Sequence, residues 1–224
     1  MPFQLAIFDL DGVIVSTADY HYLAWKRLGQ ELGFEFTKEQ NEELKGVSRD
    51  RSLEILLEIG KLEKTKEEKA ELAARKNNWY LQYISEMGPD RILPGVVPFL
   101  TELKEKGKKT ALGSASKNAP LVLKRIELEN YFDVIVDGNL VVKAKPNPEV
   151  FLRCAALLGI KPDRAVVFED APAGIEAGLR AGMITVGIGS AGALPGAHLV
   201  LKGFSSLNLD KFRQLLESRI NRRD

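Results

Sequence analysis

The fold is decided by the stretch QLAIFDLDG, residues 4–12. After Gln4 its residues up to Phe8 are apolar, which is typical of a strand buried on both faces of a parallel sheet. Asp9, Asp11 and Gly12 follow directly. Because open α/β sheets bind their ligands beyond the carboxyl ends of the strands, we expect a functional site at this point.

The flanking segments alternate short apolar runs with segments of helical periodicity. Outward from the strand at 4–8, we predict further strands at 109–113, 134–136, 165–168, 184–188 and 198–200. Helices are predicted near 95–106, 117–128, 147–158, 172–181 and 208–219. This alternation is typical of an α/β fold and predicts a Rossmann-like, doubly wound parallel sheet.

Residues 16–90 differ in character from the rest. Of these 75 residues 27 are charged, against 36 of the other 149, and no proline occurs between Thr17 and Gly88. Apolar residues at helical spacing predict amphipathic helices near 19–33, 37–44, 50–61 and 66–86. We therefore predict an α/β core of residues 1–15 and 91–224, with a helical-bundle cap of residues 16–90 inserted after the first strand.

Composition excludes several classes of partner. With 32 basic and 31 acidic residues the net charge is +1, so no overall field recruits nucleic acid or an anionic membrane. The N-terminus lacks a signal-peptide pattern, and the uncharged stretch 181–201 holds five glycines and Pro195, unlike a membrane-spanning helix. The single cysteine, Cys154, is predicted to be a buried hydrophobe in a reducing compartment. We expect a cytoplasmic protein and, since no stripe of residues marks a dimer face, a monomer.

Four acidic residues are predicted to meet at neighbouring strand ends. Asp9 and Asp11 lie two positions apart and point the same way, so their charges repel. Glu169 and Asp170 end the strand predicted at 165–168 and add further oxygen ligands. Two readings stay open: one carboxyl is kept protonated as an acid or base, or a cation such as Mg²⁺ offsets the repulsion.

Two further residues suit a phosphate group. Ser114 follows the strand at 109–113 and offers a hydroxyl and backbone amides where the next helix opens. Lys145, before Pro146 and near another helix start, adds a positive charge beside transferring oxygens.

The pattern of Asp9-x-Asp11-Gly-Val, Ser114, Lys145-Pro146 and Glu169-Asp170 resembles the haloacid dehalogenase superfamily of phosphotransferases in order and spacing. The resemblance implies that Asp9 is a nucleophile that becomes an aspartyl phosphate and that Asp11 is the general acid and base. It also implies a Mg²⁺ ion held by the Asp9 side chain, the Asp11 backbone carbonyl, and Glu169 and Asp170.

Within that superfamily, the segments TADYH (17–21), KGVSR (45–49), RKN (75–77) and SASKN (114–118) resemble the β-phosphoglucomutases. The resemblance places Asp9, Asp11, Thr17, His21, Ser114 and Lys145 in catalysis. It assigns substrate binding to Trp25, Lys45, Gly46, Val47, Ser48, Arg49, Ser52, Lys76, Ala115, Ser116, Lys117 and Asn118. The resemblance also implies that Arg49 holds the phosphate that is not being transferred, and a guanidinium can bind phosphate through two hydrogen bonds.

The expected function is the interconversion of β-glucose 1-phosphate and glucose 6-phosphate, with β-glucose 1,6-bisphosphate as intermediate and activator. The alternative on the same scaffold is a sugar-phosphate phosphatase, in which water resolves the phosphoenzyme. A receiver domain is disfavoured by the inserted cap, and a non-catalytic sugar-binding module by the complete set of polar residues. The motif GIGSAG (187–192) matches a dinucleotide pattern but does not open a βαβ unit, so it receives little weight.

Overall fold

A computed structural model describes residues 3–220. Its six strands form one parallel sheet in the order β3-β2-β1-β4-β5-β6. The strands are β1 (Leu5–Phe8), β2 (Lys109–Gly113), β3 (Val134–Val136), β4 (Ala165–Glu169), β5 (Ile184–Ile188) and β6 (Leu199–Leu201). The strand order reverses direction at β1, as in a doubly wound sheet, so the predicted fold class is confirmed.

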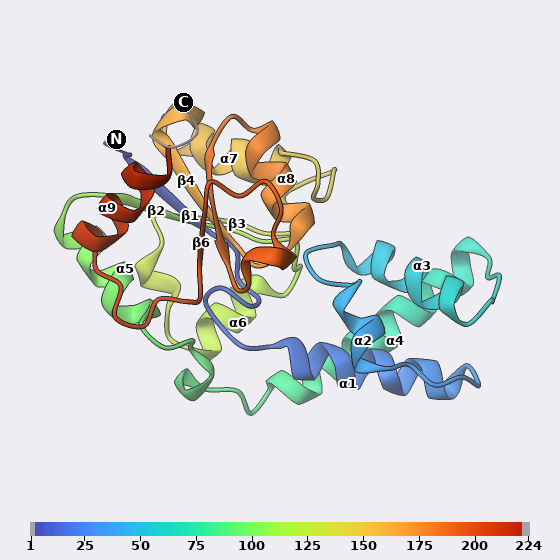
Figure 1. Ribbon diagram of the computed structural model, residues 1–224. Helices are drawn as coiled ribbons and strands as arrows, with labels where there is room; N and C mark the ends of the chain where they lie inside the picture. Colours follow the sequence, from blue (N-terminus) through green and yellow to red (C-terminus); the bar gives the residue numbers. More distant parts are fainter. Residues whose placement is uncertain (1–2, 221–224) are drawn as a thin grey trace.

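Helices cover both faces of this sheet (Figure 1). They are α5 (Val96–Glu105), α6 (Ala119–Arg125), α7 (Glu149–Leu157), α8 (Pro172–Arg180) and α9 (Leu209–Ile220). Leu5 and Ile7 of β1 pack with α7 and α8, whereas Ala6 and Phe8 pack with α5, α6 and α9. The alternation explains why β1 is apolar throughout: both of its faces are buried. Short 3₁₀ turns cover Pro89–Arg91, Glu129–Tyr131, Pro162–Arg164 and Ala191–Ala193.

The central strands are aligned by aromatic packing next to their carboxyl ends. Phe8 pairs in register with Phe168 of β4, and their rings stack with centroids 4.7 Å apart. The backbone N–H of Asp9 then donates to the Phe168 carbonyl across 2.9 Å. This register places Asp9 beside Glu169, the last residue of β4.

Four helices lie between β1 and α5 and form a separate bundle beside the sheet (Figure 1). They are α1 (Ala18–Glu31), α2 (Lys38–Glu42), α3 (Arg49–Ile59) and α4 (Lys66–Ile84). Both α1 and α3 pack on α4, and Thr37 and Thr65 close capping boxes that begin α2 and α4. The predicted cap limits of 16 and 90 stay a prediction, and the ends of the predicted core, residues 1–2 and 221–224, lie outside the described residues.

A helix boundary and a strand boundary in the sheet domain differ from those predicted from the sequence. The helix expected from 117 begins at Ala119, because Ser114 and Ser116 accept hydrogen bonds from the backbone N–H groups of Ser116 and Asn118. The last strand begins at Leu199 instead of 198, although the backbone N–H of His198 still donates to the carbonyl of Thr185 in β5.

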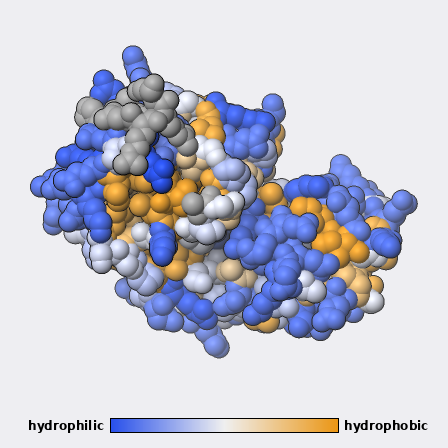
Figure 2. All heavy atoms as spheres, in the orientation of Figure 1, coloured by the Kyte–Doolittle hydropathy of each residue, from blue (hydrophilic) through white to orange (hydrophobic). Residues whose placement is uncertain are grey.

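The high share of charged residues in 16–90 is visible on the surface of the helical bundle (Figure 2). Hydrophilic residues cover much of the visible face of the helical bundle, whereas the largest apolar area in this view lies over the sheet domain (Figure 2). No helix in the described residues is long and apolar enough to span a membrane.

Candidate active site

A buried ion-pair cluster lies at the carboxyl ends of β1 and β4. Nζ of Lys145 donates to Oδ1 of Asp9 and to Oε1 of Glu169, both across 2.6 Å. The three residues are 4%, 5% and 0% exposed, respectively. Burial alone would lower the pKa of Lys145, but the charges of Asp9 and Glu169 raise it above its usual value. Lys145 is therefore a permanent positive charge beside Asp9.

Carboxylate oxygens of Asp9, Glu169 and Asp170 lie within 4.8 Å of one another. Burial and mutual repulsion raise the pKa of both Glu169 and Asp170 above their usual range. Lys145 offsets only part of the repulsion among these three carboxylates. Carboxylate oxygens are hard donors, so the three together suit a divalent cation such as Mg²⁺. Gly12, with φ of 77°, makes the close approach possible, since a Cβ there would lie 2.1 Å from Oδ2 of Asp170.

The side chain of Asp11 is not one of these three clustered carboxylates. Its Oδ1 accepts a hydrogen bond from the hydroxyl of Thr17, at the start of α1. Burial and the charge of Asp9 raise the pKa of Asp11 to about 6, while Thr17, Lys145 and Lys76 act in the opposite direction. A carboxyl with such a pKa can take up and release a proton near neutral pH.

The segment Ser114–Asn118 forms the second edge of the core site. Ser114 is 1% exposed, and its Oγ accepts from the backbone N–H of Ser116 at 3.1 Å. Oγ of Ser116 accepts in turn from the N–H of Asn118 at 3.2 Å. Each serine keeps its own hydroxyl hydrogen to donate, which suits a phosphate oxygen.

Across from these residues, the bundle contributes Lys76, a buried lysine that His21, Trp25 and Arg49 surround. Nζ of Lys76 lies 3.0 Å from Nδ1 of His21 and 4.4 Å from the centre of the Trp25 ring. Burial and the charge of Arg49 lower the pKa of Lys76 to about 7, although Asp11 raises it. Burial, followed by Lys76 and Arg49, lowers the pKa of His21 well below its usual value. An anion bound here would favour the charged form of Lys76.

The loop before α3 brings the bundle against the core. Gly46, with φ of 71°, lies so close that a Cβ there would be 2.6 Å from Cβ of Ala171. Oγ of Ser48 accepts from the N–H of Arg51 at 3.3 Å and caps α3, which begins at Arg49. Lys45 pairs with Glu42 across 2.7 Å.

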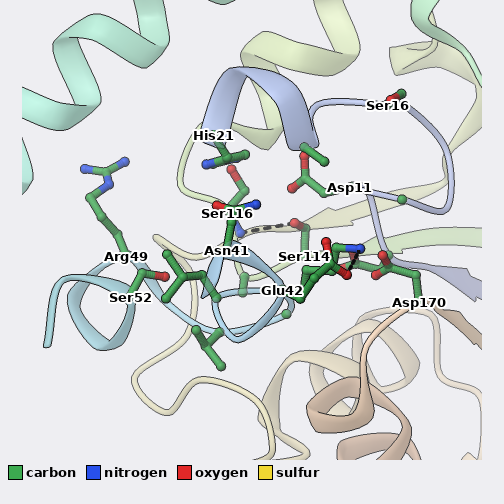
Figure 3. Close-up of a pocket in the computed structure, with 18 of the residues that line it drawn as sticks. Asp11, Ser16, His21, Asn41, Glu42, Arg49, Ser52, Ser114, Ser116 and Asp170 are labelled. Atoms are coloured by element: carbon green, nitrogen blue, oxygen red, sulfur yellow. Dashed lines mark hydrogen bonds and ion pairs between the residues drawn. The ribbon is translucent and has the colours of Figure 1, made fainter. Parts of the chain in front are cut away.

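One cavity of about 620 Å³ lies between bundle and core and collects most of the predicted site residues. Figure 3 shows Asp11, Ser114 and Asp170 on the core side, with Arg49, Ser52 and Asn41 on segments of the bundle. The predicted residues that line it are Asp9, Asp11, His21, Trp25, Lys45, Gly46, Val47, Arg49, Ser52, Lys76, Ser114, Ala115, Ser116, Lys117, Asn118 and Asp170. The substrate cavity and the carboxylates therefore form one site.

Four of the predicted site residues do not line this cavity: Thr17, Ser48, Lys145 and Glu169. Thr17 is fully buried and bonds to Asp11. Glu169 reaches the site through Lys145. Lys145 and Ser48 line a smaller neighbouring cavity of about 220 Å³.

The structure also adds residues that sequence reasoning missed. They are Ser16, Ala18, Asn41, Glu42, Leu44, Leu93, Pro172, Ile188, Gly189, Ser190, Ala193 and Leu194. Asn77, of the RKN segment at 75–77, also lines the cavity but had been given no role. The GIGSAG motif at 187–192 was the available signal for part of this set, because it covers the end of β5 and the turn after it, at the same sheet edge as Asp9. Asn41 is 7% exposed on the short helix α2 and carried no such signal.

Comparisons with known proteins agree with this geometry. The family model of haloacid dehalogenase-like hydrolases matches residues 3–182. The chain is 44% identical over 209 residues to a β-phosphoglucomutase from Bacillus subtilis (strain 168), covering 92% of each protein. It is 32% identical over 183 residues to a phosphorylated carbohydrates phosphatase from Thermotoga maritima, covering 80% of this chain and 82% of that protein.

A solved structure gives the same result. The crystal structure of a β-phosphoglucomutase from Clostridium difficile superposes with a TM-score of 0.92 at 39% identity, over 98% of this chain and 99% of that one. The resemblance found in the sequence is thus confirmed over the core and the helical insertion alike. The chain belongs to the haloacid dehalogenase-like hydrolase family and is a homologue of β-phosphoglucomutase.

Proposed function

We propose that this protein is a Mg²⁺-dependent β-phosphoglucomutase that works through phosphorylated Asp9 and β-glucose 1,6-bisphosphate. The observation that carries the proposal is that one cavity has Asp9, which pairs with Lys145, at one side and Arg49 and Lys76 at the other. A sugar with two phosphates needs cationic groups at both ends. The 44% identity to a protein named β-phosphoglucomutase supports the same substrate.

In the first half-reaction, phosphorylated Asp9 donates its phosphoryl group to the C6 hydroxyl of β-glucose 1-phosphate. Asp11 takes the proton of that hydroxyl as the oxygen bonds to phosphorus and the bond from phosphorus to Asp9 breaks. The pKa of about 6 makes Asp11 an effective base for this proton. Asp9 regains a carboxylate, which Lys145 stabilises.

The bisphosphate then presents its C1 phosphate to Asp9. Asp9 attacks phosphorus while Asp11 returns the proton to the departing C1 oxygen, which leaves glucose 6-phosphate and restores the phosphoenzyme. Arg49 and the segment Ser116–Asn118 exchange which phosphate they hold between the two steps. Asp9, Glu169, Asp170 and the Asp11 carbonyl would hold a Mg²⁺ ion, which would supply charge neutralisation for the transferring oxygens.

Closure of the cap over the core excludes water, which favours the sugar hydroxyl as acceptor. A sugar-phosphate phosphatase is the competing assignment, because it shares the phosphoenzyme and differs only in the acceptor. We further infer that the protein acts as a monomer in the cytoplasm.

Product analysis tests the proposal. Purified protein, Mg²⁺, β-glucose 1-phosphate and a trace of the bisphosphate are followed for glucose 6-phosphate and for inorganic phosphate. We expect glucose 6-phosphate to form much faster than phosphate. Release of phosphate at the rate of substrate loss would identify a phosphatase, and no turnover of any phosphosugar would favour a binding module.

A further inference from the structure

The cap and the core are joined by a hydrogen bond between two asparagines. Nδ2 of Asn118, in the segment after β2, donates to Oδ1 of Asn77 on α4 across 2.9 Å. Both residues are half-buried and line the cavity. The mechanism above assigns no role to Asn77, although it directly follows Lys76.

From Asn118 the contact continues to the nucleophile's side of the site. The N–H of Asn118 bonds to Oγ of Ser116, and the N–H of Ser116 bonds to Oγ of Ser114. Asn77 is thus the cap end of a chain of three hydrogen bonds that ends at a 1%-exposed serine. A hydrogen bond is directional, so this chain fixes the orientation of the segment as well as its position.

The close approach of Gly46 to Ala171 has a different character. It joins a glycine Cα to a methyl group, and a Cβ on Gly46 would lie 2.6 Å from that methyl. Such a contact limits how near the two parts come but imposes little direction on either. The directional link between α4 and the phosphate segment is therefore the Asn77–Asn118 bond.

We propose that Asn77 is a positioning residue: its bond to Asn118 holds Ser114–Asn118 in the geometry that receives phosphate when the cap is closed. This inference rests on the proposed function and extends it to the choice between the sugar hydroxyl and water as acceptor of the phosphoryl group. Without the bond, the cap separates more readily from the core and water reaches phosphorylated Asp9. Water then attacks phosphorus, the bond to Asp9 breaks, and inorganic phosphate is released with the Asp9 carboxylate.

The test compares Asn77→Ala with Asn78→Ala. Asn78 is the next residue of α4 and is exposed, so it is a matched control. Alanine favours the helix in both variants. From β-glucose 1-phosphate, Asn77→Ala is expected to raise the ratio of inorganic phosphate to glucose 6-phosphate about fivefold, the effect of losing one neutral hydrogen bond. Thermal unfolding of both variants establishes that they fold.

An unchanged ratio in Asn77→Ala, or an equal rise in Asn78→Ala, would overturn the proposal. The double variant Asn77→Ala/Asn118→Ala supplies a second readout. If the two residues act through their bond, the Asn77 change adds nothing to the ratio once Asn118 is alanine. If instead the double variant raised the ratio by the product of the two single-variant increases, Asn77 and Asn118 would act independently, which would contradict the proposal.

The wild-type protein separates this inference from the proposed function. Wild-type protein that forms no glucose 6-phosphate contradicts the mutase assignment itself. Wild-type mutase activity together with an insensitive Asn77→Ala variant contradicts only the role of Asn77.

Discussion

The ammonium nitrogen of Lys145 lies 2.6 Å from Oδ1 of Asp9, although the two residues are 136 positions apart in the chain. The same nitrogen bonds to Glu169, so one cation neutralises two carboxylates in a site almost without exposure. Because buried charges are costly without a partner, this contact links the stability of the core to its chemistry.

Lys145→Met should therefore destabilise the protein. Removal of the cation leaves Asp9 and Glu169 buried and unpaired, and a loss of about 3–5 kcal/mol is expected. Urea unfolding measures it, with exposed Lys143→Met as the control. Added Mg²⁺ should recover part of the loss, since an ion that binds only the folded state stabilises it. Equal stabilities of the two variants would show that Lys145 does not hold the carboxylates together.

Asp9→Asn should abolish the phosphoenzyme. An amide lacks the anionic oxygen that attacks phosphorus, so incubation with acetyl phosphate and Mg²⁺ should leave the mass of the protein unchanged. Intact-protein mass spectrometry measures the modification. Asp163→Asn, an exposed change in a 3₁₀ turn, should be phosphorylated like the wild type. Phosphorylation that persists in Asp9→Asn would remove Asp9 as the nucleophile.

Asp11→Asn should separate proton transfer from phosphoryl transfer. Loss of a general acid and base costs about 10²–10⁴-fold in rate, so sugar turnover should fall by that amount. Acetyl phosphate has a leaving group that needs no protonation, and its transfer to Asp9 should be much less affected. Rapid-quench measurement of both rates is the test, and equal losses with the two donors would contradict the role of Asp11.

Arg49→Ala should weaken binding of the bisphosphate. The loss of charged hydrogen bonds to a phosphate corresponds to about 10- to 100-fold in affinity. Arg51→Ala is the matched control on α3, because Arg51 pairs with Glu54 and Glu58 at the surface. Asp9 should still be phosphorylated by acetyl phosphate in both variants. Unchanged affinity in Arg49→Ala would exclude the guanidinium as a phosphate ligand.

Phosphosugar affinity should fall as the pH rises above about 7. The groups that face Lys76 are His21 and Trp25 of α1, Arg49 of α3, Tyr80 of its own helix and Asp11 after β1. The pKa of Lys76 is lowered to about 7, so its positive charge is present below that pH and is lost above it. Burial lowers the pKa of His21 well below its usual value, so His21 stays neutral over the same range.

Binding of glucose 6-phosphate to the Asp9→Asn variant, measured by calorimetry between pH 7 and 9, should weaken by at most about tenfold per pH unit. Lys76→Met in that background should flatten the dependence. The same slope with and without Lys76 would assign the titration to another group.

Much of the fold and part of the site follow from local sequence. β2, β3 and β5 have the predicted bounds, because short apolar runs between helical segments leave few alternatives in a doubly wound sheet. The meeting of Asp9 with Glu169 and Asp170 also follows, because parallel strands end at one edge. The proposed roles of these residues derive from the family resemblance and remain predictions.

The stretch at 4–12 by itself determined that a buried strand ends in paired carboxylates, because strand periodicity and burial are local properties of the chain. Only the tertiary structure decided that Lys145 joins Asp9 to Glu169, that Asn41 and the loop after β5 wall the cavity, and that Asn77 meets Asn118. The first of these contacts depends on how segments of the core far apart in sequence pack together, and the others depend on how the cap packs on the core; such packing is set by the shapes of both surfaces together.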